Sequence, residues 1–156
     1  MSGTSLDGLD IVKCTFKKEV NWSFQLENFE TIKYSEKWKD TLESLHLKNE
    51  NEIKDIDKIY GKFIGEKVNK FIKKYNIHTD YISSHGHTIF HDPVNNFTLQ
   101  IGAGKIISEV TEITTINNFR ELDVSFGGQG APLVPIGDLL LFSEYKYCLN
   151  LGGFAN

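Results

Sequence analysis

The chain has 156 residues, 40% of them hydrophobic, a net charge of −4 and an isoelectric point near 5.7. This size predicts one domain with one hydrophobic core, and the acidic balance argues against nucleic acid or an anionic membrane as the main partner. Because no stretch approaches the ~20 apolar residues of a membrane span and no signal peptide precedes the first motif, we expect a cytoplasmic protein.

The chain opens with a turn rich in glycine and hydroxyl groups, which leads into a predicted strand at residues 9–16. Gly3 and Gly8 can adopt positive φ and approach a ligand closely. Successive backbone amides in such a turn form an anion-binding concavity, and Asp7 and Asp10 beside it suit a hydrated magnesium ion. The turn lacks the Gly-Lys-Ser/Thr sequence of a P-loop, and a loop that opens a β-hairpin explains it equally well.

Alternating and helical patterns predict the next three elements. Residues 23–34 predict a second strand, with a bulge or a break at Phe29, where the apolar alternation loses phase. Two helices are expected next, at 36–48 and 50–75. The second has acidic residues at its start and lysines at its end, as the helix macrodipole favours.

The second half of the chain alternates short strands with helices. Strands are predicted at residues 81–84, 89–91, 97–101, 114–118 and 146–151. Helices are predicted at residues 102–109 and 136–142, and a glycine-rich loop at 127–130. This alternation is typical of an α/β domain.

Neither a metal centre nor a disulfide is the favoured interpretation of the histidines and cysteines. His85, His87 and His91 have H-x-H-x₃-H spacing, which zinc could use. They fall across a strand end and a hairpin, however, with no nearby cysteine and no HExxH helix. Cys14 and Cys148 lie far apart in apolar patterns without CxxC spacing, so we expect two buried free thiols.

Asp123 and Arg120 form the candidate catalytic pair. Asp123 precedes the glycine-rich loop, a position from which a carboxylate can reach a bound substrate. The same carboxylate could instead satisfy backbone amides of that loop. Arg120 is the only arginine of the chain, and its guanidinium could orient Asp123, form a structural salt bridge or bind a ligand carboxylate.

Four segments together resemble the anhydro-N-acetylmuramic acid kinases of bacterial cell-wall recycling: residues 2–10, 84–88, 119–135 and 150–156. The resemblance spans the whole chain but only the first half of such a kinase. It implies a ribonuclease H-like (actin-like ATPase) α/β fold, with a central mixed sheet flanked by helices. It also divides the chain into an N-terminal kinase domain, 1–144, and the first strand and second phosphate turn of a C-terminal domain, 145–156.

The resemblance implies an ATP-dependent kinase that hydrolytically opens 1,6-anhydro-N-acetylmuramic acid and phosphorylates O6. The product would be N-acetylmuramic acid 6-phosphate. Asp123 occupies the position of the base that activates water in this family. Two other functions stay open: an isolated domain that binds sugar or phosphate without catalysis, and a kinase of the same superfamily that acts on an ordinary hexose.

The resemblance also implies which residues hold the ligands. The sugar would contact four residues, namely His85, Thr88, Gln100 and Arg120, the last through the lactyl carboxylate. ATP would lie against two turns, formed by Gly3, Thr4, Ser5, Leu6, Asp7, Gly8 and Asp10 and by Gly152 and Gly153. Asp7 would hold Mg²⁺ through water. His87 stands where many relatives carry glutamine, and it can become charged near pH 6.5.

In the kinases that the chain resembles, a short apolar strand precedes the first motif and lies at the centre of the sheet. Here Met1 alone precedes that motif. We therefore expect the apolar segment 145–151 to fill or cover this position. It would do so in its own chain or, by strand exchange, in a second copy as a homodimer.

Overall fold

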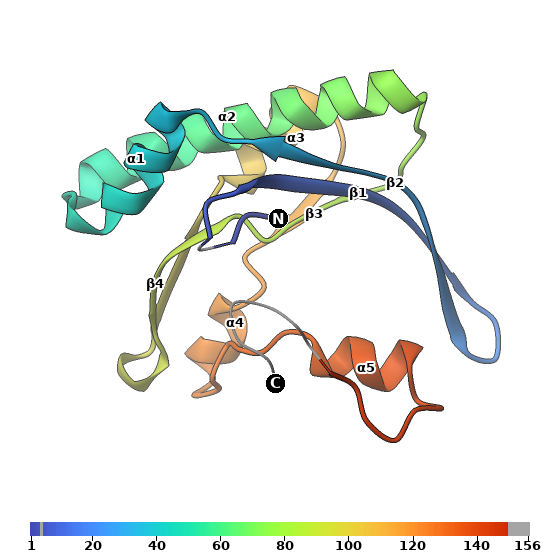
Figure 1. The fold of residues 1–156 in the computed structure, drawn as a ribbon. Coiled ribbons are helices and arrows are strands. Elements are labelled where there is room, and N and C mark those ends of the chain that lie inside the picture. The colour runs from blue at the N-terminus through green and yellow to red at the C-terminus, as the bar shows by residue number, and fades with distance from the viewer. Residues whose placement is uncertain (4, 150–156) are drawn as a thin grey trace.

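The computed structural model describes residues 1–3 and 5–149, which form a mixed α/β domain (Figure 1). Its strands are β1 (Gly8–Lys18), β2 (Trp22–Lys33), β3 (Ile82–Ser84), β4 (His87–Asp92), β5 (Phe97–Ile101) and β6 (Thr115–Asn117). Its helices are α1 (Glu36–Ser44), α2 (Glu50–Tyr75), α3 (Gly104–Thr111), α4 (Glu121–Ser125) and α5 (Pro135–Leu141), with 3₁₀ turns at Leu45–Leu47 and Pro93–Asn95. None of the described helices is long and apolar enough to span a membrane.

The strands form three separate two-stranded sheets in place of the expected central mixed sheet. β1 pairs with β2 and β4 with β5, both antiparallel, whereas β3 and β6 are parallel. Within residues 1–3 and 5–149, the free edge of β1 carries one isolated bridge, between Ser2 and Leu9, and no strand joins β1 to β3.

The strand predicted at 146–151 is wrong over residues 146–149, and residues 150–151 lie outside the described chain. This segment is apolar, but Tyr145, Tyr147 and Leu149 are exposed, and no described strand pairs with it. The β-propensity of a segment does not make a strand without a neighbour to share its backbone hydrogen bonds. The described part of 145–149 therefore does not fill the expected position in the sheet.

Several predicted elements are confirmed. The helix predicted at 50–75 is α2, and it begins with a capping box in which Asn49 and Glu52 satisfy each other's backbone amides. The strand predicted at 97–101 is β5. The helix predicted at 36–48 ends at Ser44 and continues as a 3₁₀ turn. Helix α4 was not predicted, because five residues are too few to show a helical period.

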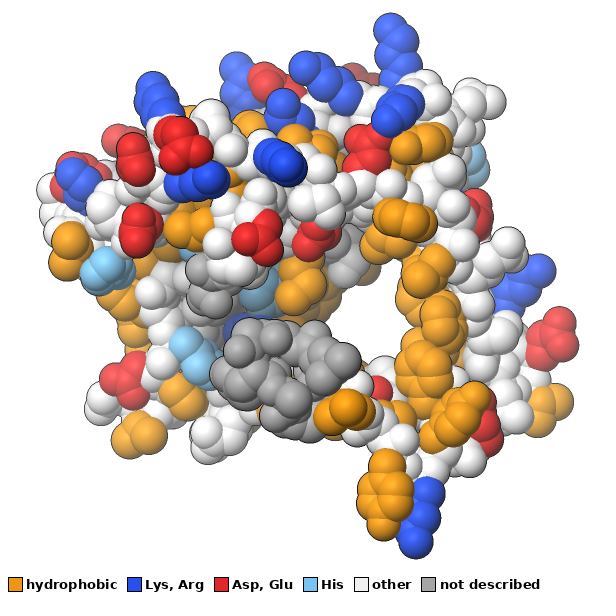
Figure 2. Space-filling view, viewed as in Figure 1, with side chains coloured by type: hydrophobic (Ala, Val, Ile, Leu, Met, Phe, Trp, Pro, Cys, Tyr) orange, Lys and Arg blue, Asp and Glu red, His pale blue; other side chains and the backbone are white. Residues whose placement is uncertain are grey.

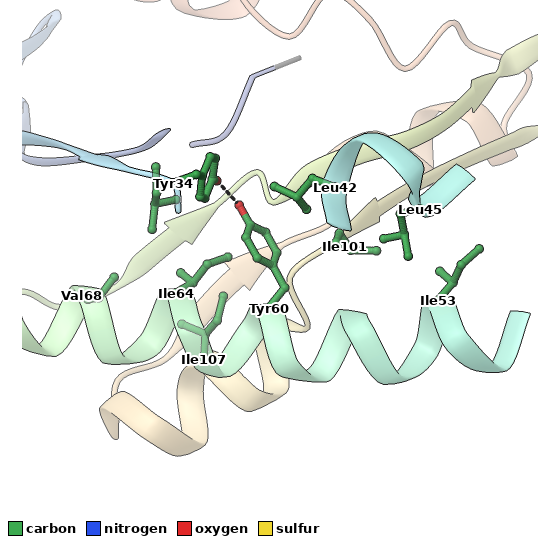
Figure 3. Close-up of a cluster of buried hydrophobic side chains, with 10 residues drawn as sticks. Tyr34, Leu42, Leu45, Ile53, Tyr60, Ile64, Val68, Ile101 and Ile107 are labelled. Atoms are coloured by element: carbon green, nitrogen blue, oxygen red, sulfur yellow. Dashed lines mark hydrogen bonds between the residues drawn. The ribbon is translucent and has the colours of Figure 1, made fainter. Parts of the chain in front are cut away.

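The core lies between the β1–β2 hairpin and helix α2, which extends across one face of the hairpin (Figure 1). Tyr60 of α2 is fully buried at its centre. Its hydroxyl lies 2.5 Å from that of Tyr34, which follows β2 (Figure 3). Leu42, Ile101 and Ile107 close the cluster from three other segments (Figure 3), so this core joins both halves of the described chain.

The opposite face of the hairpin is apolar but largely uncovered. Cross-strand pairing places Val12 beside Phe29 and Phe16 beside Phe24, and all four are exposed. Figure 2 shows apolar side chains along one side of an opening in the surface. Among residues 1–3 and 5–149, an aromatic contact reaches this face only at its far end, where Phe142 contacts Phe24 edge-on, with ring centroids 5.6 Å apart.

Two further expectations about the hairpin need correction. The register shifts where Lys13 faces Asn28 and Cys14 faces Leu26, so the bulge lies at Glu27 rather than at Phe29. Both cysteines are free thiols, as expected, but only Cys14 is partly buried and Cys148 is exposed. The exposure of Cys148 follows from the missing strand at residues 146–149.

Helices α2 and α3 approach each other through two glycines of α2. A methyl group on Gly65 would lie 2.8 Å from Cβ and Cγ1 of Val110. One on Gly61 would lie 2.9 Å from the carbonyl oxygen of Ala103. Glycine at both positions therefore lets the backbones meet, which fixes α3 and the end of β5 against α2.

We predict that Gly65→Ala destabilises the protein by about 1–3 kcal/mol, because the added methyl group overpacks this helix contact. Gly137→Ala is the matched control, since it also lies in a helix but has nothing within 4 Å of its added carbon. The control should be neutral or stabilising by up to about 1 kcal/mol. Urea unfolding of both variants checks this, and equal stabilities would contradict the close approach.

Candidate functional site

The N-terminal turn is tight and partly buried. The Leu6 amide donates to the Gly3 carbonyl at 3.2 Å, and Leu6 has φ of 55°. Gly8 is buried, and a β-carbon there would lie 2.5 Å from the Ile32 carbonyl oxygen. Asp7 is exposed, whereas the Asp10 carboxylate accepts a hydrogen bond of 2.6 Å from the Thr31 hydroxyl.

This geometry suits Asp7 better than Asp10 as a water-mediated magnesium ligand, because the Asp10 carboxylate is already engaged. Thr4, Gly152 and Gly153, which were expected at the phosphate turns, lie outside the described residues. The roles predicted for these residues and for the rest of the turn stay predictions.

A buried hydrogen bond joins this turn to the segment around the histidines. Ser2 and His87 are 3% and 4% exposed, and the Ser2 hydroxyl lies 2.9 Å from Nδ1 of His87. Burial lowers the pKa of His87, and the neighbouring His85 lowers it further. His87 is therefore held neutral at physiological pH and supports the core rather than facing a ligand, a role that the sequence did not indicate.

His85, two positions before His87, forms different contacts. His85 accepts a hydrogen bond of 3.0 Å at Nε2 from Nε of Arg120. Its Nδ1 then carries the proton and donates to the Gly86 carbonyl at 3.2 Å. Burial and the Arg120 charge lower the pKa of His85, which agrees with this neutral tautomer.

Arg120 and Asp123 contact the same residue of the glycine-rich loop, Gly130, through its two neighbouring peptide groups. Nη1 of Arg120 donates to the Gly130 carbonyl at 2.7 Å, while the Gly130 amide donates to Oδ2 of Asp123 at 2.6 Å. Gly130 has φ of 62°, and a β-carbon there would lie 2.6 Å from Val124. Only glycine fits this position. Its two hydrogen bonds connect Arg120, Asp123 and the loop, and we call these residues the Gly130 unit.

The predicted direct pairing of Arg120 with Asp123 is not formed, because Gly130 lies between them. The alternative in which Asp123 satisfies loop amides is what the structure contains. Yet Asp123 is exposed, and within the described residues no hydrogen bond reaches its second oxygen. An oriented carboxylate with one free oxygen can still accept a proton from water, so its catalytic role stays a prediction.

Thr88 and Gln100, the other predicted sugar contacts, are directly opposite each other on β4 and β5. Their side chains therefore share one face of this hairpin, and His87 and Ile101 point into the core on the other. Helix α4, which follows Arg120, packs against β5. The hairpin that carries Thr88 and Gln100 is thus next to the helix that begins after Arg120, and contact of these residues with a sugar stays a prediction.

Sequence reasoning missed Asp57, which fixes the end of β5. Its Oδ1 accepts a hydrogen bond of 2.7 Å from the Gly102 amide. Burial raises the pKa of this carboxyl above its ordinary value. In the sequence Asp57 stands on a charged helix face, so no local signal distinguished it from solvent-exposed neighbours.

The three histidines do not form a ligand set. His85 is bonded to Arg120, His87 to Ser2, and His91 to the Thr98 hydroxyl at 3.1 Å. Across residues 1–3 and 5–149, no group of three or more His, Cys, Asp or Glu side chains could hold a metal ion. The H-x-H-x₃-H spacing reflects strand geometry instead.

Comparison with known proteins identifies the family of the chain. The profile described as anhydro-N-acetylmuramic acid kinase matches residues 1–156. The chain belongs to this family. Anhydro-N-acetylmuramic acid kinases from Pseudoalteromonas translucida (strain TAC 125) and Acinetobacter baylyi are each 38% identical over the whole chain, which covers 43% of each relative. The kinase from Clostridioides difficile is 37% identical over the whole chain, which covers 45% of that relative.

The chain therefore spans less than half the length of these curated relatives. Within it lie the turn around Gly3 and Gly8, the His85–Arg120 pair and the Gly130 unit.

We predict that the protein loses stability as the pH falls through about 6.5. In the unfolded chain histidine has its ordinary pKa, whereas burial lowers the pKa of His85 and His87 in the folded chain. Between those values the unfolded chain binds more protons, so stability falls as pH falls. His87→Gln should reduce this loss, measured as the difference in urea midpoint between pH 7.5 and 5.5. His78→Gln, at an exposed position, is the control, and equal pH dependence in both variants would contradict the buried role.

Proposed function

We propose that this chain forms the N-terminal part of an ATP-dependent kinase that opens 1,6-anhydro-N-acetylmuramic acid and phosphorylates O6. The family match over residues 1–156 carries this proposal. The product would be N-acetylmuramic acid 6-phosphate, formed in the cytoplasm during cell-wall recycling. In this proposal residues 1–144 belong to an actin-like domain, and residues 145–156 begin a second one.

The proposed chemistry has two coupled steps. The anhydro sugar has no free hydroxyl at C6, because oxygen bridges C1 and C6. Asp123 takes a proton from water, water attacks C1 and the C1–O bond breaks. The released O6 then attacks the γ-phosphorus of ATP, and ADP leaves. The Gly130 unit supports this role, because it fixes one oxygen of Asp123 and leaves the other exposed.

The charged and polar residues divide into two proposed ligand sites. The turn that holds Gly3, Asp7 and Gly8 would bind the ATP phosphates through its backbone amides. Mg²⁺, reached through water from Asp7, would neutralise phosphate charge when bound. The lactyl carboxylate would bind Arg120. Its guanidinium donates two hydrogen bonds within the described residues, and its other N–H groups could donate to the carboxylate.

We predict that the 156-residue chain alone does not hydrolyse or transfer phosphate from ATP, because it covers only 43–45% of its relatives and holds no more than the start of the second domain that would position the nucleotide against the first. A chimaera in which the chain precedes the remaining part of the Clostridioides difficile relative should release ADP when the anhydro sugar is added. A coupled ADP assay on both proteins tests this. Sustained turnover by the 156-residue chain would show that the rest of the second domain is not needed.

We predict that Asp123→Asn in this chimaera lowers kcat by at least about 10²-fold while the KM for sugar changes only a few-fold, as expected for loss of a general base. Asparagine can still accept the hydrogen bond from Gly130, so the loop is kept. Asp80→Asn, at an exposed position away from this loop, is the control. An unchanged kcat would place the base elsewhere, with Asp7 the next candidate.

A further inference from the structure

The N-terminal turn is closed by a bridge whose two residues are both buried. Ser2 and Leu9 form this antiparallel bridge, and beside it the Asp10 amide donates to the Met1 carbonyl at 2.8 Å. Ser2 and Leu9 are each 3% exposed. Leu9 holds its end of the turn by packing in the hydrophobic core. Ser2 holds the other end through its hydroxyl, so the position of the turn depends on what that hydroxyl binds.

The Ser2 hydroxyl meets side chains from three other segments. It lies 2.9 Å from Nδ1 of His87, the first residue of β4. Burial raises the pKa of Tyr34 and of Tyr60, and hydrogen bonding to Ser2 opposes the rise in both. The two tyrosine hydroxyls share one hydrogen bond, at 2.5 Å, which uses one of their two protons. The Ser2 oxygen can accept the other proton, and the proton of Ser2 itself then goes to Nδ1 of His87.

His87 is a fixed partner for this bond. It is paired with Ile101 across the β4–β5 hairpin, and the Asp57 carboxylate accepts from the next amide along, that of Gly102, at 2.7 Å. Gly86, which precedes His87, has φ of 72°, and a β-carbon there would clash with the Ile101 carbonyl oxygen. This end of the hairpin is therefore held against α2 by contacts that do not involve the N-terminal turn.

From His87 the contacts continue to the candidate catalytic carboxylate. His85, two residues earlier, accepts a hydrogen bond of 3.0 Å from Arg120. Arg120 donates to the Gly130 carbonyl, and the Gly130 amide donates to Asp123. The Ser2–His87 bond thus connects the N-terminal turn to the segment whose next contacts orient Asp123.

We propose that Ser2 is a positioning residue for phosphoryl transfer, because its bond to His87 fixes the N-terminal turn relative to Asp123. This inference rests on the proposed function, in which the turn holds the ATP phosphates and Asp123 acts on the sugar. The O6 atom released on the sugar must meet the γ-phosphorus held by the turn. Displacement of reacting groups by about 1 Å can cost about 10²-fold in rate, so this bond matters more for transfer than for binding of either ligand.

Kinetics of the chimaera with the remaining part of the Clostridioides difficile relative test this role. Ser2→Ala should lower kcat by about 10-fold or more while the KM values for ATP and sugar change only a few-fold. His87→Leu breaks the same bond, so the double variant should be no slower than the slower single variant. His87→Gln keeps an acceptor for Ser2 and should retain most of the native kcat. Ser23→Ala, at an exposed position on β2, should leave kcat unchanged.

A loss of stability alone would not give this pattern. Gly65→Ala should destabilise the same protein through the contact between α2 and α3, but it should leave kcat unchanged because Gly65 faces Val110 rather than Ser2 or His87. An equal fall in kcat in Gly65→Ala, or additive losses in the double variant, would overturn the inference.

Amide hydrogen exchange in the 156-residue chain provides a test that needs no activity. The Leu6 amide, bonded to the Gly3 carbonyl within the turn, should exchange about 10-fold faster or more in Ser2→Ala. The Glu112 amide, bonded to the Ser108 carbonyl at the end of α3, should keep its native rate. Unchanged Leu6 exchange, or unchanged kcat for Ser2→Ala in an active chimaera, would overturn this inference alone. A native chimaera that does not phosphorylate the sugar would overturn the proposed function together with it.

Discussion

Burial of one face of α2 is the constraint on which the rest of the structure depends. Tyr60 has no exposed surface and reaches Tyr34 at the end of β2, which ties the hairpin to the helix. One turn earlier, Asp57 holds the Gly102 amide at the end of β5. One turn later, Gly65 admits α3 at backbone contact. A single helix thus sets the relative positions of the N-terminal turn and the segment around Gln100.

The candidate site depends on polar contacts between segments that pack around α2. The Ser2–His87 bond joins the N-terminal turn to β4 inside the core, where a neutral imidazole costs less than a charged one. Outside the core, Arg120 donates a hydrogen bond to the Gly130 carbonyl, and Asp123 accepts one from the Gly130 amide. The interior bond keeps the two segments together, and the Gly130 unit presents a carboxylate to solvent. One pair of residues therefore positions the two segments, and other residues carry the candidate catalytic groups.

The uncovered apolar face of the hairpin and the separation of the strands into three sheets have a common explanation. Val12, Phe16 and Phe29 are exposed on a face that in a closed α/β domain would be packed. The chain spans 43–45% of the curated relatives compared above, so the described residues form part of the family's architecture rather than all of it. The other face of the hairpin packs against α2, and the core around Tyr60 lies between them.

Much of the local structure was determined by the sequence alone. Helix α2 was predicted at its observed bounds, because helical spacing and capping depend on residues three or four apart. The hairpins followed from alternation, and the family motifs marked residues 2–10 and 119–135. The bulge was expected two residues too late, at Phe29 rather than Glu27, because phase shows that a slip occurs but not which residue is extra.

Contacts between distant segments were decided only by the tertiary structure. Ser2 and His87 are 85 positions apart, and Asp57 and Gly102 are 45 apart, so no local pattern relates them. Arg120 and Asp123 are close in sequence, yet packing inserts Gly130 between them. The segment 146–149 has the composition of a strand, but no described strand pairs with it. Sequence periodicity reports interactions within a segment, whereas buried hydrogen bonds and strand pairing require a partner that only the folded chain supplies.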